Sequence, residues 1–519
     1  MTQALRNSVA QARRRQVLAR VLLVLICNSV PGVANTQAID SPIRIGITAP
    51  PPSKGNPFGA LSEPSIHTWD AIFDALTVYE SQSQPQPGLA TGWEQTGPLK
   101  WRFRLRDQVR FHNGELLDAD AVKATLDYLS SPEGQATTVG REVAGLKRVI
   151  ATDDSTLVIE TQEPDPILPG RLALVPIVAP LAWSELGPAG YAESPIGTGP
   201  YELTSWGVAN ASIELNPRPD SYRARSEMMP IELRPILDIG GRIAALRSGG
   251  VDIVIGLSPD DWGRLEGEGF RRVIDVQSQI MSLAFRTVGN TNSPIRSAAI
   301  RRALNMAIDR DLIASALYAD LVEPATQGAV LSVNGFNPDL PPFPFEPDRA
   351  REIIVEEGYP NGFKMNIDVF QSTTSSLLEY QYVAQALERI GVTVTLRQIA
   401  FADWLRRYHS GDWGDTDAFS LVWNTQAVRD AIRPMEYFSC LKNPPFFCEQ
   451  ALMPKIMAIK TELDSQQRTQ ALQDMQYDLR DLSPSIMLMP RVNIIAYSDR
   501  IQSLPLRNSV VLYSDVRLQ

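Results

Sequence analysis

The chain has 519 residues, 44% of them hydrophobic, with 49 basic and 59 acidic side chains and a formal charge of −10 at pH 7. This length predicts two or three domains, because single hydrophobic cores stop growing near about 250 to 300 residues. An acidic surface repels phosphates and argues against nucleic acid as a partner, although solubility alone explains such a surface without any partner.

The first 38 residues have the features of a secretory signal peptide. Five arginines, the last of them Arg20, precede the apolar run Val21 to Ile26, and small residues follow at Gly32, Ala34 and Ala38. The run is much shorter than the ~20 residues that cross a bilayer, so a permanent anchor is disfavoured. Cleavage after residue 38 would remove five of the 49 basic residues and no acidic one, which leaves a formal charge of −15.

Two other features of this leader leave alternatives open. Arg14 and Arg15 begin a stretch that resembles a twin-arginine motif, although basic leaders often contain such pairs. Cys27 raises the possibility of a lipoprotein, but Ile26 stands where lipoprotein signals have Gly, Ala or Ser. General secretion is favoured over both alternatives.

Cys440 and Cys448 are the two cysteines left after the leader, with seven residues between them in SCLKNPPFFC. In an oxidising compartment such a pair is most simply one disulfide that closes a proline-containing loop. A metal site is disfavoured, because this stretch offers too few ligands and His67, His112 and His409 are far apart in sequence. We predict a disulfide and no metal.

The first elements after the leader are a strand and a helix. Ile43 to Ile47 alternates as a strand and leads into the irregular loop Pro50 to Pro57. Trp69 to Tyr79 has apolar residues at helical spacing, which predicts a helix. Trp69, Phe73 and Leu76 are expected to form its packing face rather than to contact a ligand.

The stretch Gly88 to Ser130 carries the clearest pattern of the chain. Trp101, Phe103 and Leu105 alternate with arginines, which is the two-residue period of a half-buried strand. Asn113-Gly114 then favours a tight turn, and Asp118 stands at the N-cap of a helix that begins at Ala119. The sequence therefore predicts a strand, a turn and a capped helix.

Further elements follow at regular intervals. Val149 to Thr161 predicts a β-hairpin, and SPIGTGPY at Ser194 to Tyr201 predicts a tight turn, with an anion site at its two glycines as the weaker alternative. A helix that ends at Gly249-Gly250 precedes the buried strand Val251 to Ile255. This order is half of a crossover unit and predicts a mixed sheet with helices on its faces.

The second half of the chain continues the alternation of helices and strands. The predicted strands are Ile280 to Phe285, Phe363 to Phe370, Val392 to Ile399 and Phe419 to Trp423, and the predicted helices are Ile300 to Ile308 and Leu377 to Ile390.

Three stretches, Leu89 to Val122, Pro195 to Tyr201 and Arg302 to Arg310, resemble the signature of the family 5 extracellular solute-binding proteins, which are oligopeptide, dipeptide, opine and nickel-complex receptors of ABC importers. The resemblance extends from Ile43 to about Tyr497. It implies an α/β fold, a two-lobed type II periplasmic binding protein with mixed sheets. It also implies a monomeric periplasmic receptor, without a cofactor, that closes over a peptide or other small solute and docks on an inner-membrane ABC permease.

The same resemblance divides the chain. Lobe 1 is expected from residues 39–75, 190–283 and 492–519, with a subdomain at 76–189 inserted in it. Lobe 2 is expected at 284–491, and the hinge is expected near Ala284 and Arg491.

Candidate ligand contacts follow strand ends, because ligands of open α/β sheets bind beyond the carboxyl ends of the strands. Phe370, Gln371 and Thr373 lie at one such end, where hydroxyls and helix N-terminal amides suit a carboxylate, although Ser and Thr there are also ordinary helix caps. The loop after the first strand, which the family places at the cleft, adds Asn56 and Phe58.

Trp423 matches a tryptophan that the family places in the cleft, and ligand contact is favoured over core packing there. Asn424, Gln426 and Arg429 follow it. Peptide receptors of the family have an aspartate at the position of Gln426, which pairs with the peptide's α-amino group. Glutamine brings no charge, and Arg429 suits a carboxylate, so a non-peptide or blocked ligand is an open alternative to a peptide.

Enzyme motifs are weak in this sequence. It contains no G-x-S-x-G, Walker or H-E-x-x-H pattern. Ser439 to Lys442 fits S-x-x-K but lacks the companion motifs and lies in the predicted disulfide loop. A binding protein without catalytic residues is therefore preferred over a secreted hydrolase or a chaperone on the same scaffold.

Overall fold

The computed structural model describes residues 41–519 except 62, 81–82, 209–211, 290–292 and 371–373. The predicted signal peptide, Gln371 and Thr373 lie outside the described residues. Residues Ile43–Gln519 form one compact unit. Every element named below belongs to it.

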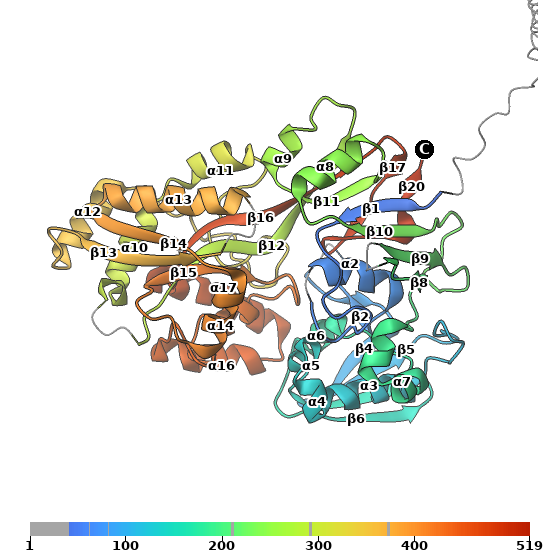
Figure 1. Ribbon diagram of the computed structural model, residues 1–519. Helices are drawn as coiled ribbons and strands as arrows, with labels where there is room; N and C mark the ends of the chain where they lie inside the picture. The colour runs from blue at the N-terminus through green and yellow to red at the C-terminus, as the bar shows by residue number, and fades with distance from the viewer. Residues whose placement is uncertain (1–40, 62, 81–82, 209–211, 290–292, 371–373) are drawn as a thin grey trace, which may run out of the picture. The chain divides into compact units, whose positions relative to one another are not determined.

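A ten-stranded sheet is the main element of this unit (Figure 1). Parallel pairing of β1 with β10 and β11, and of β13 with β14 and β15, is combined with antiparallel pairing of β12 and β16, so the predicted mixed α/β sheet is confirmed. In spatial order the strands are β14 (Val392–Gln398), β13 (Phe363–Val369), β15 (Ala418–Asn424), β12 (Arg271–Phe285), β16 (Ser485–Tyr497), β11 (Ile253–Leu257), β1 (Ile43–Ile47), β10 (Ile231–Pro235), β9 (Ile213–Pro217) and β8 (Tyr201–Ser205).

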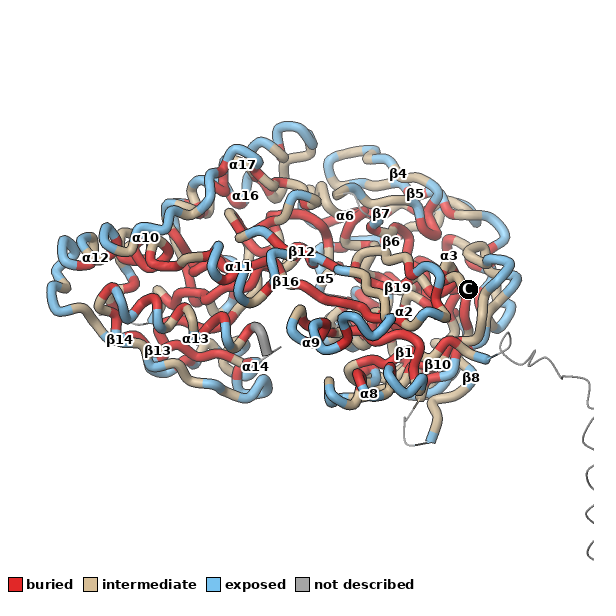
Figure 2. The backbone as a smooth tube through the Cα atoms, turned by 90° about the horizontal axis from the view of Figure 1, so that it is seen from above, coloured by how far each residue is buried: buried red, intermediate tan, exposed pale blue. Residues whose placement is uncertain are grey.

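Two long strands, β12 and β16, join the two ends of this sheet, and Figure 2 shows both buried for most of their length. Their antiparallel register shifts between Val276 and Ile280 and again between Ile280 and Ser282. Ile280 lies opposite Pro490, which has no amide hydrogen to donate to the ladder. The pairing of the two strands is therefore weakest at this point.

A separate four-stranded antiparallel sheet contains β4 (Ala90–Gly97), β5 (Lys100–Leu105), β7 (Thr156–Thr161) and β6 (Leu146–Asp153) in that order. The predicted alternation in β5 is confirmed, because Phe103 and Leu105 are buried whereas Arg102 and Arg104 are exposed. Asp118 is the N-cap of α3 (Ala119–Ser130), and its Oδ1 accepts a 2.8 Å hydrogen bond from the amide of Ala121.

The helix predicted over Trp69 to Tyr79 is wrong in its bounds. The helix α2 spans Glu63–Ile72, and residues Thr77–Val78 form the short strand β2, which pairs with β3 (Gln86–Pro87). The carbonyl of Ile72 accepts a hydrogen bond from the amide of Gly199 rather than from the next helical turn, and the carbonyls of Ala75 and Leu76 accept from the amides of residues 88–90. Trp69, Phe73 and Leu76 are buried as predicted, although only Trp69 lies within α2.

Helices cover both faces of the large sheet (Figure 1): α11 and α13 lie above β13 and β14, whereas α14, α16 and α17 lie below. The predicted strand Ile280 to Phe285 is the second part of β12. The remaining helices are α4 (Pro132–Gln135), α5 (Thr138–Glu142), α6 (Leu168–Arg171), α7 (Pro180–Glu193), α8 (Ile239–Arg247), α9 (Pro259–Gly263), α10 (Ala298–Met306), α11 (Arg310–Tyr318), α12 (Pro347–Glu356), α13 (Thr374–Arg389), α14 (Phe401–Ser410), α15 (Ile432–Tyr437), α16 (Met453–Thr461) and α17 (Ser465–Leu482).

Two short antiparallel pairs complete the chain: β17 (Ile501–Ser503) with β20 (Arg517–Leu518), and β18 (Leu506–Arg507) with β19 (Val510–Val511). None of the helices in the described part of the chain is both long and apolar enough to traverse a bilayer.

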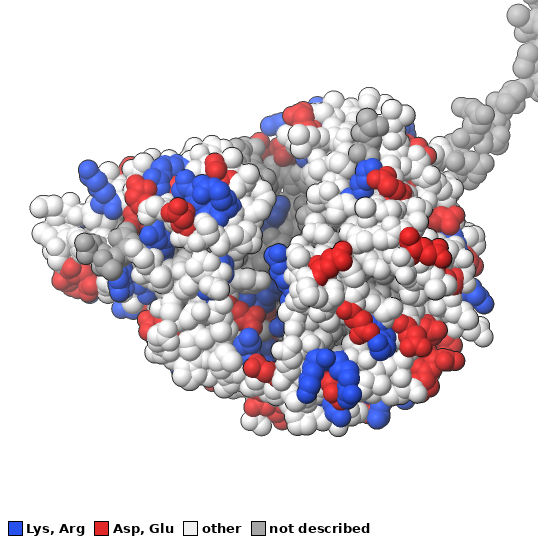
Figure 3. Space-filling model, turned by 60° about the horizontal axis from the view of Figure 1, so that its bottom comes forward, with Lys and Arg blue, Asp and Glu red and all other residues white. Residues whose placement is uncertain are grey.

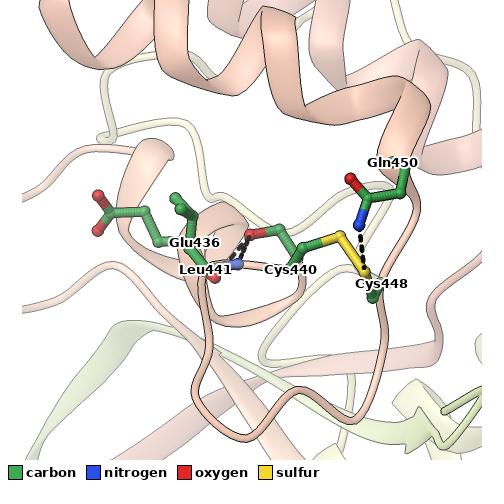
Figure 4. The surroundings of a disulfide bond; sticks show 6 residues. Glu436, Cys440, Leu441, Cys448 and Gln450 are labelled. Carbon is green, nitrogen blue, oxygen red and sulfur yellow. Dashed lines mark hydrogen bonds between the residues drawn. A yellow bond between two sulfur atoms is a disulfide. The ribbon is translucent and has the colours of Figure 1, made fainter.

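The predicted disulfide is confirmed. Cys440 and Cys448 are bonded, and the loop they close follows α15 (Figure 4). Gln450 donates a hydrogen bond to the sulfur of Cys448 from the segment that leads into α16.

Candidate ligand site

Polar side chains from three distant segments meet beside the weak point of the β12–β16 pairing. We call this set the junction cluster. Its members share one hydrogen-bond network and are Asp275, Gln277 and Ser278 of β12, Gln426 and Arg429 of the loop after β15, and Asn508 and Ser509 of the turn between β18 and β19.

Gln426 links all three segments. Its Oε1 accepts a 3.0 Å hydrogen bond from the amide of Ser278, and its Nε2 donates to Ser509 Oγ at 2.7 Å and to the carbonyl of Asn508 at 3.3 Å. An amide can accept and donate at the same time, whereas a carboxylate can only accept. A carboxylate at position 426 would therefore lose the contacts to the turn at Asn508 and Ser509.

Arg429 is a buried cation with uncharged partners. Its side chain donates to Asn508 Oδ1 at 2.9 and 3.3 Å and to Ser332 Oγ at 3.0 Å, and the residue is 8% exposed. Burial lowers the pKa of Arg429, while the nearby charge of Asp275 acts in the opposite direction. Guanidinium groups in such surroundings favour a planar anion that can accept two hydrogen bonds, such as a carboxylate.

Asp275 and Gln277 lie two residues apart on β12 and therefore point to the same face. Asp275 Oδ1 accepts a 2.9 Å hydrogen bond from Ser509 Oγ, and Gln277 Nε2 lies 3.4 Å from Asp275 Oδ2. Within the described part of the chain, Gln277 Oε1 is buried and has no hydrogen-bond partner. Buried acceptors in native proteins are usually matched by protein groups or by ordered water, so a water or another donor is expected at Gln277 Oε1.

The backbone of the cluster is strained. Eight non-glycine residues of the described chain have positive φ, and three of them are Arg429 (46°), Asn508 (47°) and Ser509 (69°). Asn tolerates this region, but Arg and Ser adopt it at a cost. Strained backbone of this kind gathers at ligand-binding sites, where the surrounding structure holds it in place.

A cavity of about 210 Å³ adjoins the cluster. Val428 and Asp430, which flank Arg429 in sequence, line it together with Tyr79, and Tyr79 Oη donates a 2.6 Å hydrogen bond to the carbonyl of Val428. Trp93 and Trp101 of the four-stranded sheet also line it. Figure 3 shows a groove between the half that carries β13–β15 and the half that carries β4–β9, with charged side chains on its walls.

A second cavity of about 440 Å³ has several charged residues in its walls. Glu142, Arg171, Glu436 and Lys460 are among the residues that line it. These groups pair with one another or with neighbouring charges, for example Lys460 with Glu436 at 2.9 Å, so the charges of this cavity are already matched by the protein.

Most of the predicted site residues lie outside the junction cluster. Trp423 is fully buried, stacked on Phe438 with ring centroids 4.0 Å apart, and its Nε1 donates to Ser485 Oγ. Asn424 Oδ1 accepts from the amide of Gln426 and so adjoins the cluster. Phe370 packs against the rings of Phe401 and Trp404.

The loop after β1 is also distant from the cluster in its contacts. Asn56 Oδ1 accepts from the amide of Phe58, and Phe58 is fully buried against Tyr128 and Trp183. Ligand contact by Asn56, Phe58, Phe370 and Trp423 therefore stays a prediction. Sequence reasoning missed the residues of β12 and of the turn at 508–509. The polar residues at positions 275, 277 and 279, two apart in a predicted strand, were a usable signal for β12.

Two of the three motif stretches, Leu89 to Val122 and Pro195 to Tyr201, contact each other. The amide of His112 donates to the carbonyl of Gly197, and burial lowers the pKa of His112 to about 4, which keeps its ring neutral near pH 7. A Cβ on Gly197 would lie 1.9 Å from the carbonyl oxygen of Ile72, so this glycine permits close packing of two chain segments. The turn interpretation of SPIGTGPY is supported over an anion site.

The S-x-x-K residues hold the disulfide loop. Ser439 Oγ donates to the carbonyl of Glu436 and accepts from the amide of Leu441. Lys442 Nζ donates to the carbonyl of Tyr408 at 3.0 Å and to that of Pro444 at 3.2 Å. Both side chains thus have structural partners.

Two sheet halves joined by long strands, with a polar cluster and a groove at the junction, have the fold of the type II periplasmic binding proteins. The sequence model of the bacterial extracellular solute-binding proteins, family 5 (middle region), matches residues 84–445. The chain therefore belongs to this family.

Similar proteins are consistent with this assignment. The glutathione-binding protein GsiB of Pectobacterium atrosepticum is 24% identical over 387 residues, which cover 74% of this chain and 72% of that one. The protein of the same name from Escherichia coli K12 is 26% identical, but only 57% of each chain aligns. The substrate-binding protein CtaP of an ABC transporter from Listeria monocytogenes has the same fold, with a TM-score of 0.82 and 17% identity over 92% of this chain and 99% of that one.

Proposed function

We propose that this protein is the soluble receptor of an ABC importer, which binds a peptide or peptide-like solute in the groove at the junction cluster and delivers it to an inner-membrane permease. Family membership supports the receptor class. The location of the site is supported by the junction cluster. Asp275, Arg429 and Ser509 meet there, the backbone is strained, and the buried oxygen Gln277 Oε1 has no hydrogen-bond partner among the described residues.

The proposed mechanism is closure of two lobes about the β12–β16 pair. Lobe 1 is residues 39–75, 190–283 and 492–519 with its inserted subdomain at 76–189, and lobe 2 is residues 284–491. The bulge between Val276 and Ile280, opposite Pro490, supports a hinge slightly earlier in β12 than Ala284 and close to Arg491 in β16. A ligand shifts the equilibrium towards the closed form. The free energy of this shift is the difference between the ligand's binding free energies for the closed and the open form.

Contacts to the ligand are proposed from both lobes. Lobe 2 contributes Gln426, Arg429 and, as predicted from the sequence, Asn424, Phe370 and Trp423. Lobe 1 contributes the polar face of β12 and the turn at Asn508 and Ser509. Export through a cleaved signal peptide at residues 1–38 and action as a monomer in the periplasm complete the proposal.

The experiment that tests the function is native mass spectrometry of the protein purified from its own host. One equivalent of a small solute, released unchanged on denaturation and able to rebind with a saturable change in intrinsic fluorescence, is expected. Chemical conversion of the solute by the purified protein, or the absence of any bound or rebinding solute in periplasmic extract, would contradict the proposal.

A further inference from the structure

The cavity of about 210 Å³ beside the junction cluster is lined in part by one face of the four-stranded sheet. Gln95 lies opposite Trp101 in the register of β4 and β5, and Trp93 lies two residues before Gln95 on the same strand, so the three side chains share this face. Both indole rings are only partly buried. Because aromatic rings pack favourably on one another, open indole surface inside a cavity favours an aromatic ring as its occupant.

Gln95 adds one hydrogen-bond donor to this face. Its Nε2 is buried and has no hydrogen-bond partner among the described residues. Buried donors in native proteins are usually matched by a protein group or by ordered water, so a water or a ligand oxygen is expected at this nitrogen. A ring that carries an oxygen acceptor, such as the phenol of a tyrosine side chain, can replace this water and cover the indoles at the same time.

The charged residues that line the cavity are already paired with each other. Among the described residues around it these are Asp430 and Arg468, which form hydrogen bonds of 2.6 and 2.8 Å. Asp430 also accepts from Asn334 Nδ2 at 2.9 Å, and Thr469 Oγ1 donates to Asn334 Oδ1 at 2.8 Å. A charged ligand group would find no free counter-ion here and would lose its hydration, which is unfavourable. The cavity therefore suits an uncharged group.

The volume of the cavity limits the size of that group. About 210 Å³ is more than the roughly 150 Å³ of an apolar cavity that accepts benzene, and less than the roughly 300 Å³ at which pockets for whole drug-sized ligands begin. The cavity therefore has room for one substituted ring, and the rest of a larger ligand must lie outside it. Val428 and Asp430 line the cavity and flank Arg429, so that remainder reaches the junction cluster.

We propose that this cavity is a specificity subsite of the receptor for an uncharged aromatic side chain with an oxygen acceptor, in which the ring packs on Trp93 and Trp101 and the oxygen accepts from Gln95 Nε2. This inference rests on the proposed receptor function and specifies one side chain of its ligand. Tyr79 Oη donates to the carbonyl of Val428, so the subsite lies where the segments proposed as the inserted subdomain and as lobe 2 touch. A ring held there contacts both segments and favours the closed form.

Four probes with the same capped backbone test the proposal: N-acetyltyrosinamide, N-acetylphenylalaninamide, N-acetylleucinamide and the α-amide of N-acetylglutamate. The readout is ¹⁹F NMR of the full chain labelled with 5-fluorotryptophan, in which Trp93→Phe and Trp101→Phe each remove one of the nine tryptophan signals and so assign it. The tyrosine probe is expected to shift both signals in a saturable manner. The phenylalanine probe, which lacks the acceptor, should bind about 5-fold more weakly, the scale for one hydrogen bond.

The other two probes test the ring and the charge. The leucine probe should bind at least about 3-fold more weakly than the phenylalanine probe, because it has no ring to pack on the indoles. The glutamate probe should give no saturable shift. Equal binding of the tyrosine and glutamate probes, saturable shifts that spare both Trp93 and Trp101, or no saturable shift with any probe would overturn the proposal without any variant.

Variants identify the residues. Gln95→Met removes the donor and is expected to weaken the tyrosine probe about 5-fold while the phenylalanine probe binds as before. Equal losses for both probes would overturn the role of Gln95 Nε2. Ser465 of α17 also lines the cavity, and Ser465→Phe is expected to fill part of it and to weaken the tyrosine probe at least about 10-fold. Gln466→Phe, at the next exposed position of the same helix, is the matched control and is expected to bind as the wild type does. Thermal unfolding of each variant shows whether it is folded.

The outcomes separate this inference from the function on which it rests. If a solute co-purifies and rebinds but has no aromatic ring, or binds folded Ser465→Phe with wild-type affinity, the receptor function stands and only the subsite fails. If the tyrosine probe binds at Trp93 and Trp101 but the purified protein converts its solute chemically, the subsite stands and the receptor function fails.

Discussion

Arg433 of α15 donates two hydrogen bonds, 2.6 and 2.8 Å long, to the carboxylate of Glu142 at the end of α5. The two residues are 291 positions apart, and their side chains are only 14% and 10% exposed. This nearly buried pair connects the segment proposed as the inserted subdomain to the segment proposed as lobe 2.

Glu142→Gln should destabilise the protein by roughly 3 kcal/mol, because it leaves the charge of Arg433 poorly matched in a buried place. Urea unfolding followed by circular dichroism measures the change. The double variant Glu142→Leu with Arg433→Leu should lose less stability than the single variant, because it leaves neither of the two charges in the buried place. An equal or larger loss in the double variant would contradict this explanation.

Asp70 should make stability depend on acid pH. Burial raises its pKa, but Arg507 and Arg223 outweigh burial and lower it to about 2. Because the folded pKa lies below the unfolded one, the stabilisation is present above about pH 4 and disappears as pH falls towards 2. Asp70→Asn should therefore cost about 2 kcal/mol at pH 7 and progressively less below pH 4.

Thermal unfolding of wild type and Asp70→Asn at pH 7 and at pH 2.5 measures this difference. A difference in melting temperature between the two proteins that is the same at both pH values would contradict the proposed effect of the ion pairs. Arg507 precedes Asn508, so the same variant should also weaken ligand binding at the junction cluster.

Glu379 of α13 should cause the opposite pH dependence. Burial raises its pKa to about 8, and Tyr318 Oη lies 3.3 Å from its carboxyl group. With the folded pKa above the unfolded one, the native state holds a proton that the unfolded state releases, so stability falls as pH rises from about 4.5 to 8. The loss by pH 8 should be about 4 kcal/mol.

Glu379→Gln keeps the shape of the neutral acid and does not titrate. Melting temperatures measured between pH 5 and pH 9 should therefore decline less steeply in the variant than in the wild type. Parallel profiles for the two proteins would show that Glu379 is not the group responsible.

Gly328→Ala should displace Trp423. A Cβ at this position would lie 2.1 Å from Trp423 Cε3, which forces the indole off Phe438 and away from Ser485 Oγ. Overpacking of this kind costs about 1 to 3 kcal/mol. A lower melting temperature and a red-shifted tryptophan emission are expected.

Gly145→Ala is the control, because a Cβ there meets no atom within 4 Å. The same pair of variants tests the prediction that Trp423 contacts the ligand. Weaker binding in Gly328→Ala but not in Gly145→Ala is the expected result, and unchanged binding in both would assign Trp423 to the core alone.

The sequence by itself determined the features that depend on neighbours along the chain. Phe103 and Leu105 alternate with arginines, and this two-residue period predicts the buried face of β5. Asp118 caps the helix that follows β5. Cys440 is close enough in sequence to Cys448 for their disulfide to be predicted. The family followed from motif stretches that are continuous in the chain.

Only the tertiary structure decided where α2 ends and which residues form the junction cluster. The carbonyl of Ile72, the last residue of α2, accepts a hydrogen bond from the amide of Gly199, and Asp275 meets Ser509 across 234 residues. Hydrogen bonds and charges act through space over a few ångströms, whereas a sequence pattern records only spacing along the chain. The chemistry of Gln426 was therefore visible in the sequence, but the partners that use its amide were not.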